Sequence, residues 1–254
     1  MRGAVAARPS SFSFTPRPED GKHARVTTAS TSRHPAPRAD GGARAFFEGY
    51  AADFDHIYDD TGKGPVARFI DTHLRREMRI RFENAFETLE PLAGHSLLDA
   101  GCGGGRYAIP AAKAGAARVL GLDFSEPMLE LAREKAAAEG VAERCEFVNA
   151  DLLSHPLPEK SFDYAIAIGF FDYQADPEPA LRALARAARR RVFISLPKRW
   201  HVLTPQRKVR YALFKCFVRF YSRAEVERLA ASVAPRRTTI LDIGREYNLR
   251  LDFE

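Results

Sequence analysis

The sequence contains no uninterrupted apolar stretch of the roughly 18 residues that a membrane-spanning helix needs. Cysteine is also scarce, because Cys102, Cys145 and Cys216 are widely separated and form neither a CxxC pair nor the spacing of a metal site. These absences argue against a disulfide scaffold and a zinc ribbon, and we expect a cytoplasmic protein without a bound metal. The apolar content of 45% in 254 residues is enough to build a sizeable core.

The first 43 residues have no apolar period and are rich in Pro, Ser, Thr and Arg, which predicts a disordered basic tail over residues 1–43. Seven basic and three acidic residues give this tail a charge of +4, which leaves +2 of the total +6 for the rest of the chain. The basic composition is therefore weak evidence for nucleic-acid binding. The tail lacks the apolar segment of a secretory signal. An organelle transit peptide, a dispensable extension and an overlong start are all open interpretations.

Two helices are predicted between residues 44 and 92. Aromatic residues are concentrated in RAFFEGYAADFDHIYDD, which predicts a helix that ends near residues 61–64. From Pro65 onward, apolar residues recur at helical spacing as far as Leu89. This spacing predicts one long amphipathic helix with the proline in its first turn.

From residue 93, short apolar runs alternate with helical patterns. The runs are SLLDA (96–100), RVLGLD (118–123), CEFVNAD (145–151), DYAIAIG (163–169) and VFISLP (192–197), with helical patterns at about 105–115, 126–140 and 177–190. This alternation predicts βαβ units and a Rossmann-like, doubly wound α/β fold. A capped helix is predicted at 222–232. The last two runs, RRTTILDIG and YNLRLDFE, lie too close together for a helical crossover, so they predict a hairpin and one antiparallel strand in a seven-stranded mixed sheet.

Four glycines occupy five positions after the first run, in LLDAGCGGGRYAIP (97–110). Glycine in an ordered element costs about 0.5–1 kcal/mol relative to alanine, so the cluster needs a reason. It lies between a predicted strand and a helix, where doubly wound sheets bind their ligands. Arg106 stands where the dinucleotide pattern G-x-G-x-x-G needs its third glycine, and no G-K-[ST] follows. The cluster therefore fits neither a typical dinucleotide site nor a P-loop.

The pattern that does occur is D-x-G-x-G-x-G, formed by Asp99, Gly101, Gly103 and Gly105. The stretch LLDAGCGGGRY resembles the first motif of class I S-adenosylmethionine-dependent methyltransferases. Further motifs follow in that family's order, namely VLGLDFS, SEPML, NADL and FDYAIAIGFFDY. The resemblance spans roughly residues 44–254, with the sharp motifs in 97–173. The arrangement looks most like magnesium-protoporphyrin O-methyltransferases and uncharacterised bacterial small-molecule methyltransferases.

The resemblance implies S-adenosylmethionine as the cofactor. The glycines would make room for it, Asp123 would accept hydrogen bonds from the ribose hydroxyls, and Asp151 would bind the adenine amino group. Residues 44–92 would form a helical lid over the methionine part, and residues 93–197 the cofactor-binding core. The cofactor-binding candidates are Tyr50, Tyr58, Asp99, Gly101, Cys102, Gly103, Gly105, Asp123, Phe124, Met128, Ala150, Asp151, Leu152, Ile168 and Gly169. Alternative roles are a solvated strand-end acid for Asp123, an N-cap for Asp151, and orientation of the glycine loop for Asp99.

Methyl transfer from a sulfonium is an in-line displacement in which the cofactor carries the reactivity, so no catalytic triad is required and none is visible. Asp172 and Tyr173, just after the fourth run, are predicted to lie near the methyl group, and His201 is a candidate general base. The segment GFFDY (169–173) lacks the proline of amino-methylating DNA enzymes. No cysteine lies in the segment directly after the fourth run, where cytosine-C5 enzymes need their nucleophile. We therefore expect a small-molecule acceptor and no nucleic acid.

Residues 198–225 form a basic, aromatic segment, predicted to be a cap, with no acidic residue before Glu225. It suggests an anionic acceptor, with O-methylation favoured and with Arg199, Arg207, Arg210 and Tyr211 as binding candidates. A solvated cationic helix face and peripheral attachment to an anionic membrane are the alternatives for this cap. For the whole chain, the rival functions are a non-catalytic S-adenosylmethionine-binding module and an NAD-binding oxidoreductase. The sequence indicates no oligomeric state.

Overall fold

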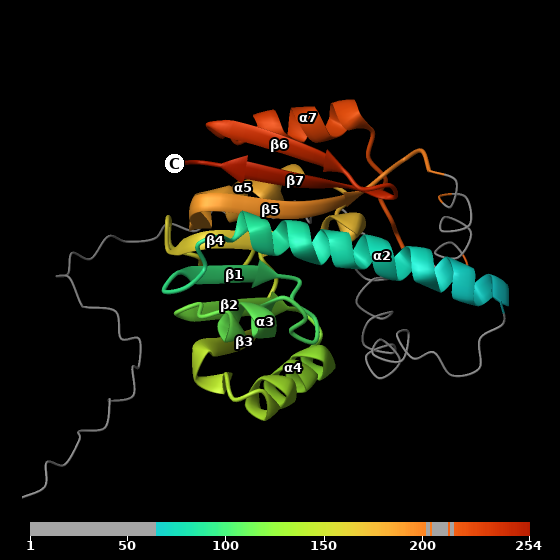
Figure 1. Ribbon diagram of the computed structural model, residues 1–254. Coiled ribbons are helices and arrows are strands. Elements are labelled where there is room, and N and C mark those ends of the chain that lie inside the picture. Colours follow the sequence, from blue (N-terminus) through green and yellow to red (C-terminus); the bar gives the residue numbers. More distant parts are fainter. Residues whose placement is uncertain (1–64, 202–203, 205–212, 214–215) are drawn as a thin grey trace, which may run out of the picture. The chain divides into compact units, whose positions relative to one another are not determined.

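A computed structural model of the chain describes residues 65–201, 204, 213 and 216–254, with side chains from residue 76 onward (Figure 1). These residues belong to one compact unit, Pro37–Glu254. Several sequence predictions lie outside the described residues. They are the tail over 1–43, the aromatic helix before residue 65, and the candidates Tyr50, Tyr58, Arg207, Arg210 and Tyr211.

A seven-stranded sheet in the order β3-β2-β1-β4-β5-β7-β6 carries the fold (Figure 1). Its strands are β1 (Ser96–Ala100), β2 (Arg118–Asp123), β3 (Cys145–Asn149), β4 (Phe162–Ala167), β5 (Ala188–Pro197), β6 (Arg237–Asp242) and β7 (Glu246–Asp252). Strand β7 runs antiparallel to both β5 and β6, while the pairs from β3 to β5 are all parallel. This confirms the predicted α/β class, the mixed sheet and the C-terminal hairpin. The chain winds outward from β1 to β3 and then returns to β4, so the strand order switches between β1 and β4.

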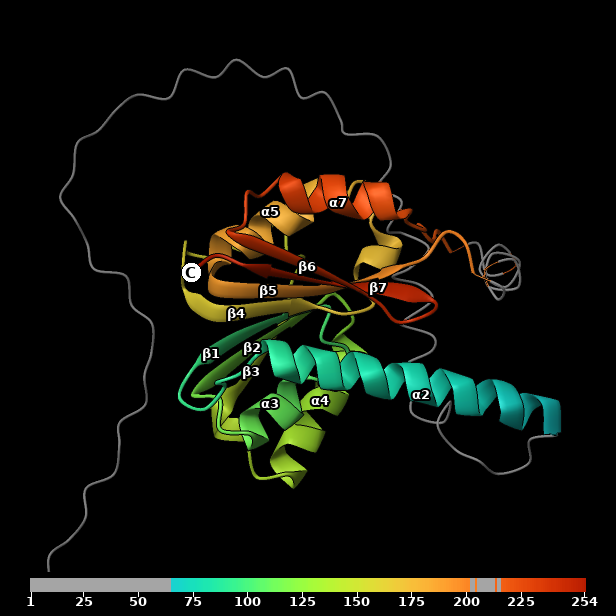
Figure 2. The ribbon, with the colours of Figure 1, turned by 45° about the horizontal axis from the view of Figure 1, so that its top comes forward.

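Helices cover both faces of the sheet. They are α2 (Pro65–Thr88), α3 (Ala108–Lys113), α4 (Glu126–Ala138), α5 (Glu178–Ala187) and α7 (Arg223–Ala231), with short 3-10 turns η2 (Ala142–Arg144) and η3 (Phe171–Tyr173). Figure 2 shows α2, α3 and α4 on one face and α5 and α7 on the other. Each face has its own cluster of buried apolar side chains. Strands such as β4 are apolar along most of their length because both of their faces are covered. No helix in the described ranges is both long and apolar enough to cross a membrane.

The predicted helix at 177–190 is wrong at its end, because α5 stops at Ala187 and β5 begins at Ala188. The arginine run of residues 189–191 has a high helix propensity, but tertiary pairing outweighs it. Arg191 lies opposite Asp252 of β7, and its Nε donates a 2.9 Å hydrogen bond to the Asp252 carboxylate. Arg189 pairs with Asp163 of β4 at 3.0 Å. These acidic partners come from other strands, which a local helical pattern does not reveal.

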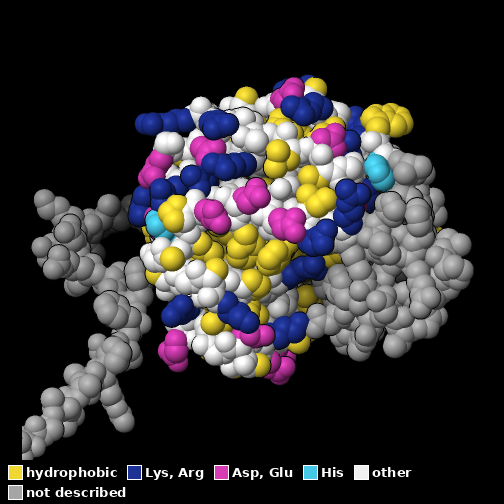
Figure 3. Space-filling view, viewed as in Figure 1, with side chains coloured by type: hydrophobic (Ala, Val, Ile, Leu, Met, Phe, Trp, Pro, Cys, Tyr) yellow, Lys and Arg dark blue, Asp and Glu magenta, His cyan; other side chains and the backbone are white. Residues whose placement is uncertain are grey.

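Polar side chains join α2 to the C-terminal hairpin, a contact we call the α2–β7 seam. It consists of the pairs Glu77–Arg245, Arg81–Glu246 and Asn84–Asn248, the last two at 3.2 Å and 3.1 Å. Their positions on α2 recur at helical spacing, so one face of the helix supplies them all. Figure 3 shows acidic and basic side chains intermixed over the surface of α2 and β7. The seam fixes the helix against the sheet through hydrogen bonds as well as through apolar packing.

We predict that Asn248→Ala lowers the free energy of unfolding by about 1–3 kcal/mol. Asn248 is 0% exposed, and its loss leaves the Asn84 amide without its acceptor in a partly buried seam. Urea denaturation monitored by circular dichroism would measure the change. Thr238→Ala, on the exposed edge strand β6, is the control and should stay within about 0.5 kcal/mol of the wild type. Equal effects of the two substitutions would contradict a stabilising role for the seam.

Candidate functional site

A cavity of about 730 Å³ opens at the carboxyl ends of β1, β2 and β4. Its position is the switch point of the strand order, where doubly wound sheets bind their ligands. The side of the cavity opposite the sheet is provided by α2 and α4. Its lining includes Met78, Arg81, Gly101, Cys102, Gly103, Gly104, Gly105, Arg106, Tyr107, Ile109, Asp123, Phe124, Met128, Leu131, Lys135, Ile168, Gly169, Phe170, Asp172 and Tyr173.

The glycine loop between β1 and α3 forms the floor of this cavity. Gly101 and Cys102 donate backbone hydrogen bonds of 2.7 Å and 3.1 Å to the carbonyl oxygen of Leu122, which ties the loop to β2. Gly105 has a φ of +79°, and a Cβ atom there would lie 2.8 Å from Cδ1 of Ile109. The absence of a side chain is thus required by the turn and by the protein's own packing, as well as leaving room for a ligand.

Asp123 lies at the end of β2 and lines the cavity. Its two carboxylate oxygens accept hydrogen bonds of 2.9 Å from the backbone N–H groups of Gly103 and Ser125. Burial raises the pKa of Asp123, while these backbone hydrogen bonds oppose the rise. A third backbone hydrogen bond, from Phe124, also lowers the pKa, so a carboxylate with about four lone-pair sites keeps limited acceptor capacity for a ligand.

Asp99 lies behind the loop rather than in the cavity lining, and it is only 1% exposed. Burial raises its pKa to about 7, and the nearby Asp123 carboxylate adds to the rise, while the backbone of Ala108 opposes it through a hydrogen bond. Its Oδ2 atom has no hydrogen-bond partner among the described residues. The bond to Ala108 connects Asp99 with the first turn of α3, which agrees with a role in orienting the glycine loop.

Cys102 is a buried thiol between two of the loop glycines. Burial raises its pKa well above the ordinary value, and the Asp99 and Asp123 charges act in the same direction. A raised pKa keeps the sulfur in its unreactive thiol form. Its Sγ atom also occupies the space beside Gly121 of β2, where a Cβ atom would lie 2.8 Å from it. The cysteine therefore acts as a small packing residue beneath the cavity.

The turn after β4 forms the opposite wall, with Gly169, Asp172 and Tyr173. The Gly169 N–H donates a 2.8 Å hydrogen bond to Oγ of the buried Ser195 on β5. Sequence reasoning missed Ser195, although a hydroxyl inside the apolar run VFISLP was a usable signal. The end of the cap also holds this turn, because the Arg219 N–H donates to the Asp172 carbonyl oxygen at 2.7 Å. In addition, the Tyr221 hydroxyl donates to the Phe171 carbonyl oxygen at 2.9 Å.

The structure brings together many, but not all, of the predicted site residues. The predicted residues that line this cavity are Gly101, Cys102, Gly103, Gly105, Asp123, Phe124, Met128, Ile168, Gly169, Asp172 and Tyr173. The predicted candidates Asp99, Ala150, Asp151, Leu152, Arg199 and His201 are not part of that lining. Asp151 instead accepts a 2.9 Å hydrogen bond from the Leu153 N–H, which is the geometry of its alternative role as the cap of a turn.

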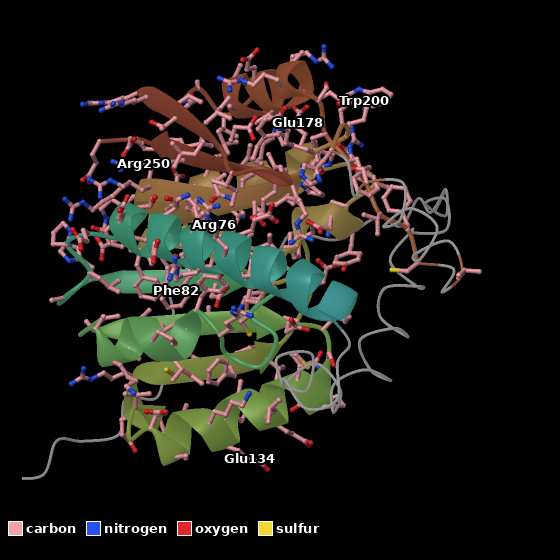
Figure 4. The ribbon with its side chains drawn as sticks, turned by 45° about the vertical axis from the view of Figure 1, so that its right-hand side comes forward. Arg76, Phe82, Glu134, Glu178, Trp200 and Arg250 are labelled. Atoms are coloured by element: carbon pink, nitrogen blue, oxygen red, sulfur yellow. The ribbon has the colours of Figure 1, made fainter. Side chains whose placement is uncertain are left out.

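The base of the cap is less positive than its sequence suggests. Arg199 donates to both carboxylate oxygens of Glu225 at 2.7 Å and 2.8 Å. Lys198 is paired in the same way with Asp242 of β6. Trp200, which follows these two basic residues directly, is 83% exposed, and it projects from the protein in Figure 4. Two of the cap's basic residues thus hold the cap to the fold.

The cavity residues that were not anticipated from the sequence include Arg81 on α2 and Tyr107 at the start of α3. The Nε of Arg81 donates a 3.2 Å hydrogen bond to the Tyr107 hydroxyl. Phe82, labelled in Figure 4, packs against the Tyr107 ring with centroids 5.5 Å apart. Burial alone would lower the pKa of Arg81, but Glu246, Tyr107 and Asp172 together raise it, so the guanidinium stays charged. Their meeting depends on the packing of α2, which motif spacing does not encode.

Fold and site together define a class I methyltransferase-type domain, with a cofactor cavity at the switch point between a glycine loop and a strand-end acid. Comparison with known families agrees, since residues 97–191 match the family model described as a methyltransferase domain. Residues 97–191 therefore carry a methyltransferase domain of the class I, S-adenosylmethionine-dependent type. This confirms the resemblance that begins at the glycine motif.

Individual relatives match part of the chain. Methyltransferase GfsG of Streptomyces halstedii is 36% identical over 107 residues, which are 42% of this chain and 38% of that protein. O-methyltransferase cnsE of Penicillium expansum is 30% identical over 132 residues, or 52% of this chain and 45% of that protein. The chain thus spans less than half the length of these curated relatives.

Solved structures extend the likeness beyond the matched segment at the level of the fold. The crystal structure of magnesium protoporphyrin IX methyltransferase from Synechocystis PCC 6803 with bound SAH has a TM-score of 0.66 and 23% identity. The alignment covers 85% of this chain and 100% of that one. The predicted similarity to that group of enzymes therefore holds for the architecture.

We predict that Gly105→Ala destabilises the protein more than Gly94→Ala does. Both glycines have positive φ, +79° and +77°, so each substitution meets a similar backbone strain of about 1–2 kcal/mol. Only the Cβ at position 105 meets other atoms, which adds about 1–3 kcal/mol of overpacking. Parallel urea denaturation of the two variants would measure the difference. Indistinguishable unfolding curves would show that the loop relaxes around the added methyl group.

We predict that the stability advantage of Asp99→Asn over the wild type grows by about 2–4 kcal/mol between pH 4 and pH 7. The folded-state pKa of Asp99 is raised from 3.8 to about 7. The protonated Asp99 side chain therefore contributes its full share to the free energy of unfolding of the wild type below pH 4. This contribution is lost as the pH rises through 7. The free energy of unfolding at several pH values would measure this.

Asp163→Asn is the matched control for this pH series. Burial alone would raise the pKa of Asp163, but hydrogen bonds from Ser96 and the charge of Arg189 lower it. An acid with a lowered pKa gives stability that is present above its unfolded value and is lost only in more acidic solution. The Asp163→Asn difference should therefore stay constant from pH 5 to pH 7. A constant Asp99→Asn difference would mean that Asp99 is ionised throughout this range.

Proposed function

We propose that the protein is a methyltransferase that transfers the methyl group of S-adenosylmethionine to an oxygen atom of a small anionic acceptor in the cytoplasm. The observation that carries this proposal is the cavity at the switch point, where the glycine loop and Asp123 face the turn of Asp172 and Tyr173. The three free cysteines support the cytoplasmic location. The name of the O-methyltransferase relative supports oxygen as the methylated atom.

The sheet side of the cavity would hold the cofactor. Gly101, Gly103 and Gly105 would let the backbone approach it, and Asp123 would accept from the ribose hydroxyls with the lone pairs that its backbone bonds leave unused. The apolar side chains of Phe124 and Met128, both in the lining, would pack against the adenosine. Asp151 and the backbone beside it would contact the adenine amino group at the end of β3.

The turn after β4 would present the acceptor to the methyl group. The sulfonium of the bound cofactor supplies the electrophilic methyl, so the protein has to align the acceptor oxygen and exclude water. Asp172, which is buried in the cavity wall, would receive the acceptor's proton, and Tyr173 beside it would orient the acceptor. In this proposal residues 93–197 are the cofactor core, 198–225 the acceptor cap with Arg199 and His201, and 44–92 the lid.

A second candidate function is a cofactor-binding module whose cap docks on a protein or membrane partner. It is favoured by the exposed apolar side chains of the cap, because Trp200 is 83%, Leu213 78% and Phe217 39% exposed. Turnover separates the two functions. An enzyme loses acceptor methylation when cap residues are replaced while keeping its affinity for the cofactor, whereas a docking module has no methylation to lose.

We predict that the full-length protein binds S-adenosylmethionine and S-adenosylhomocysteine in calorimetric titration, and that Asp123→Asn weakens both by about 10–100-fold. Hydrogen bonds to a charged group contribute about 1.5–3 kcal/mol, which is the basis of this range. Asp242→Asn, on the hairpin outside the cavity lining, is the matched control and should bind like the wild type. Far-UV circular dichroism would show that each variant is folded. Binding of NAD, but of neither adenosyl ligand, would sink the proposal.

A further inference from the structure

Strand β6 is the last strand of the sheet, and among the described strands β7 is its single neighbour (Figure 1). The N–H of Ile243 donates to the carbonyl oxygen of Glu246 at 3.1 Å, in the register of the β6–β7 pairs, so the backbone of residue 243 faces β7. Backbone direction alternates along an antiparallel strand. The N–H and C=O groups of Thr238, Ile240 and Asp242 therefore point away from β7, and no described element pairs with them.

The interior of this free edge lacks the features that usually prevent strands from pairing. Natural edge strands are blunted by proline, by a bulge or by a charge within the strand. From Thr238 to Leu241, β6 has four uncharged residues, three of them β-branched, and its pairing with β7 shows no register shift. Leu241 is also 38% exposed. Such an edge is a template for a further strand.

The two ends of β6 carry opposite charges. Arg236 and Arg237 lie at its start, where both are exposed, and neither side chain has a hydrogen-bond or ion-pair partner among the described residues. Asp242 lies exposed at its end, where it binds Lys198. When two such strands pair antiparallel, the start of each meets the end of the other, so the arginines of one copy face the acid of the second. A parallel pair would bring like charges together.

We propose that β6 is the surface through which two copies of this chain associate, with the two strands antiparallel across a two-fold axis. A register centred on Ile240 matches every free backbone group of the edge. Ile240 faces Ile240 of the second copy, and Thr238 faces Asp242 of the second copy, so the N–H and C=O groups of all three positions are bonded in both chains. A two-fold interface is self-complementary and closes after two copies. The two seven-stranded sheets then join into one continuous sheet.

The association is independent of the proposed methyltransferase function, because none of residues 236–242 lines the cavity. It gives the C-terminal hairpin a second role, since β7 binds α2 through the α2–β7 seam while β6 binds the second copy. A pair of short strands buries less surface than the standard interface of a stable complex. We therefore expect a weak, reversible dimer.

Sedimentation velocity of the full-length protein over a series of concentrations measures the association. We expect a reversible shift from the monomer mass toward twice that mass. Ile240→Pro removes an outward-facing N–H, a change that an edge strand tolerates, and should raise the dissociation constant of the dimer about 10–100-fold. Ile240→Ala removes the side chain but keeps that N–H, so it is the matched control and should dimerise much more tightly than Ile240→Pro.

Complementary charge reversals test the antiparallel arrangement without changing the backbone. The double variant Arg236→Glu and Arg237→Glu places acids against Asp242 of the second copy, whereas Asp242→Lys places a lysine against the arginines. Each variant alone should dimerise more weakly than the wild type. An equimolar mixture restores opposite charges at both ends of the strand pair and should form a heterodimer, which misfolding of either variant cannot produce. Arg228→Glu, at an exposed position of α7, is the control and should dimerise like the wild type.

A wild type that stays monomeric at every concentration overturns the inference and leaves the proposed function untouched. A dimer that persists unchanged in Ile240→Pro and in both charge variants uses a different surface, which also overturns it. Far-UV circular dichroism shows whether Ile240→Pro is folded. If it is not, the mixing experiment decides, since recovery in the mixture supports the pairing of two β6 strands and the lack of recovery refutes it.

Discussion

The hydrogen bonds between the glycine loop and the end of β2 are the contacts on which the rest of the site depends. Gly103 donates to the Asp123 carboxylate, while Gly101 and Cys102 donate to the Leu122 carbonyl oxygen. These bonds fix a loop in which three glycines, Gly101, Gly103 and Gly105, have positive φ angles. Because β1 and β2 are adjacent and parallel, the loop and the acid are brought together by the register of the sheet alone. The floor of the cavity is thus a direct consequence of strand order.

Most of this floor is predictable from the sequence because its determinants are local. Buried parallel strands have continuous apolar sequences, and the functional groups follow them at their carboxyl ends. The run RVLGLD became β2 with the predicted bounds, and Asp123 lies in the predicted cavity. The helix predicted at 177–190 is too long at its end, because Arg189 and Arg191 pair with acidic residues on other strands. Propensity within one segment carries no information about such partners.

The contacts that hold the other walls of the cavity could not be predicted, because they join residues far apart in the sequence. Arg81 reaches the site through its pair with Glu246, and Gly169 is held by Ser195 of the neighbouring strand. The cap illustrates the same limit. Its sequence has no acidic residue before Glu225, yet that residue and Asp242 neutralise Arg199 and Lys198. Net charge along a segment describes the electrostatics of a site only after the partners from elsewhere in the fold are known.

This division between local and long-range determinants matches the reach of the family resemblance. The matched segment 97–191 contains the glycine loop, Asp123 and the turn after β4, which all line the cavity. Helix α2, the cap and the C-terminal hairpin lie outside it, and they supply Arg81, Trp200 and Glu246. Residues that distinguish one acceptor from another are therefore to be sought at the contacts between these outer segments. The α2–β7 seam is the place where two of them meet at the cavity.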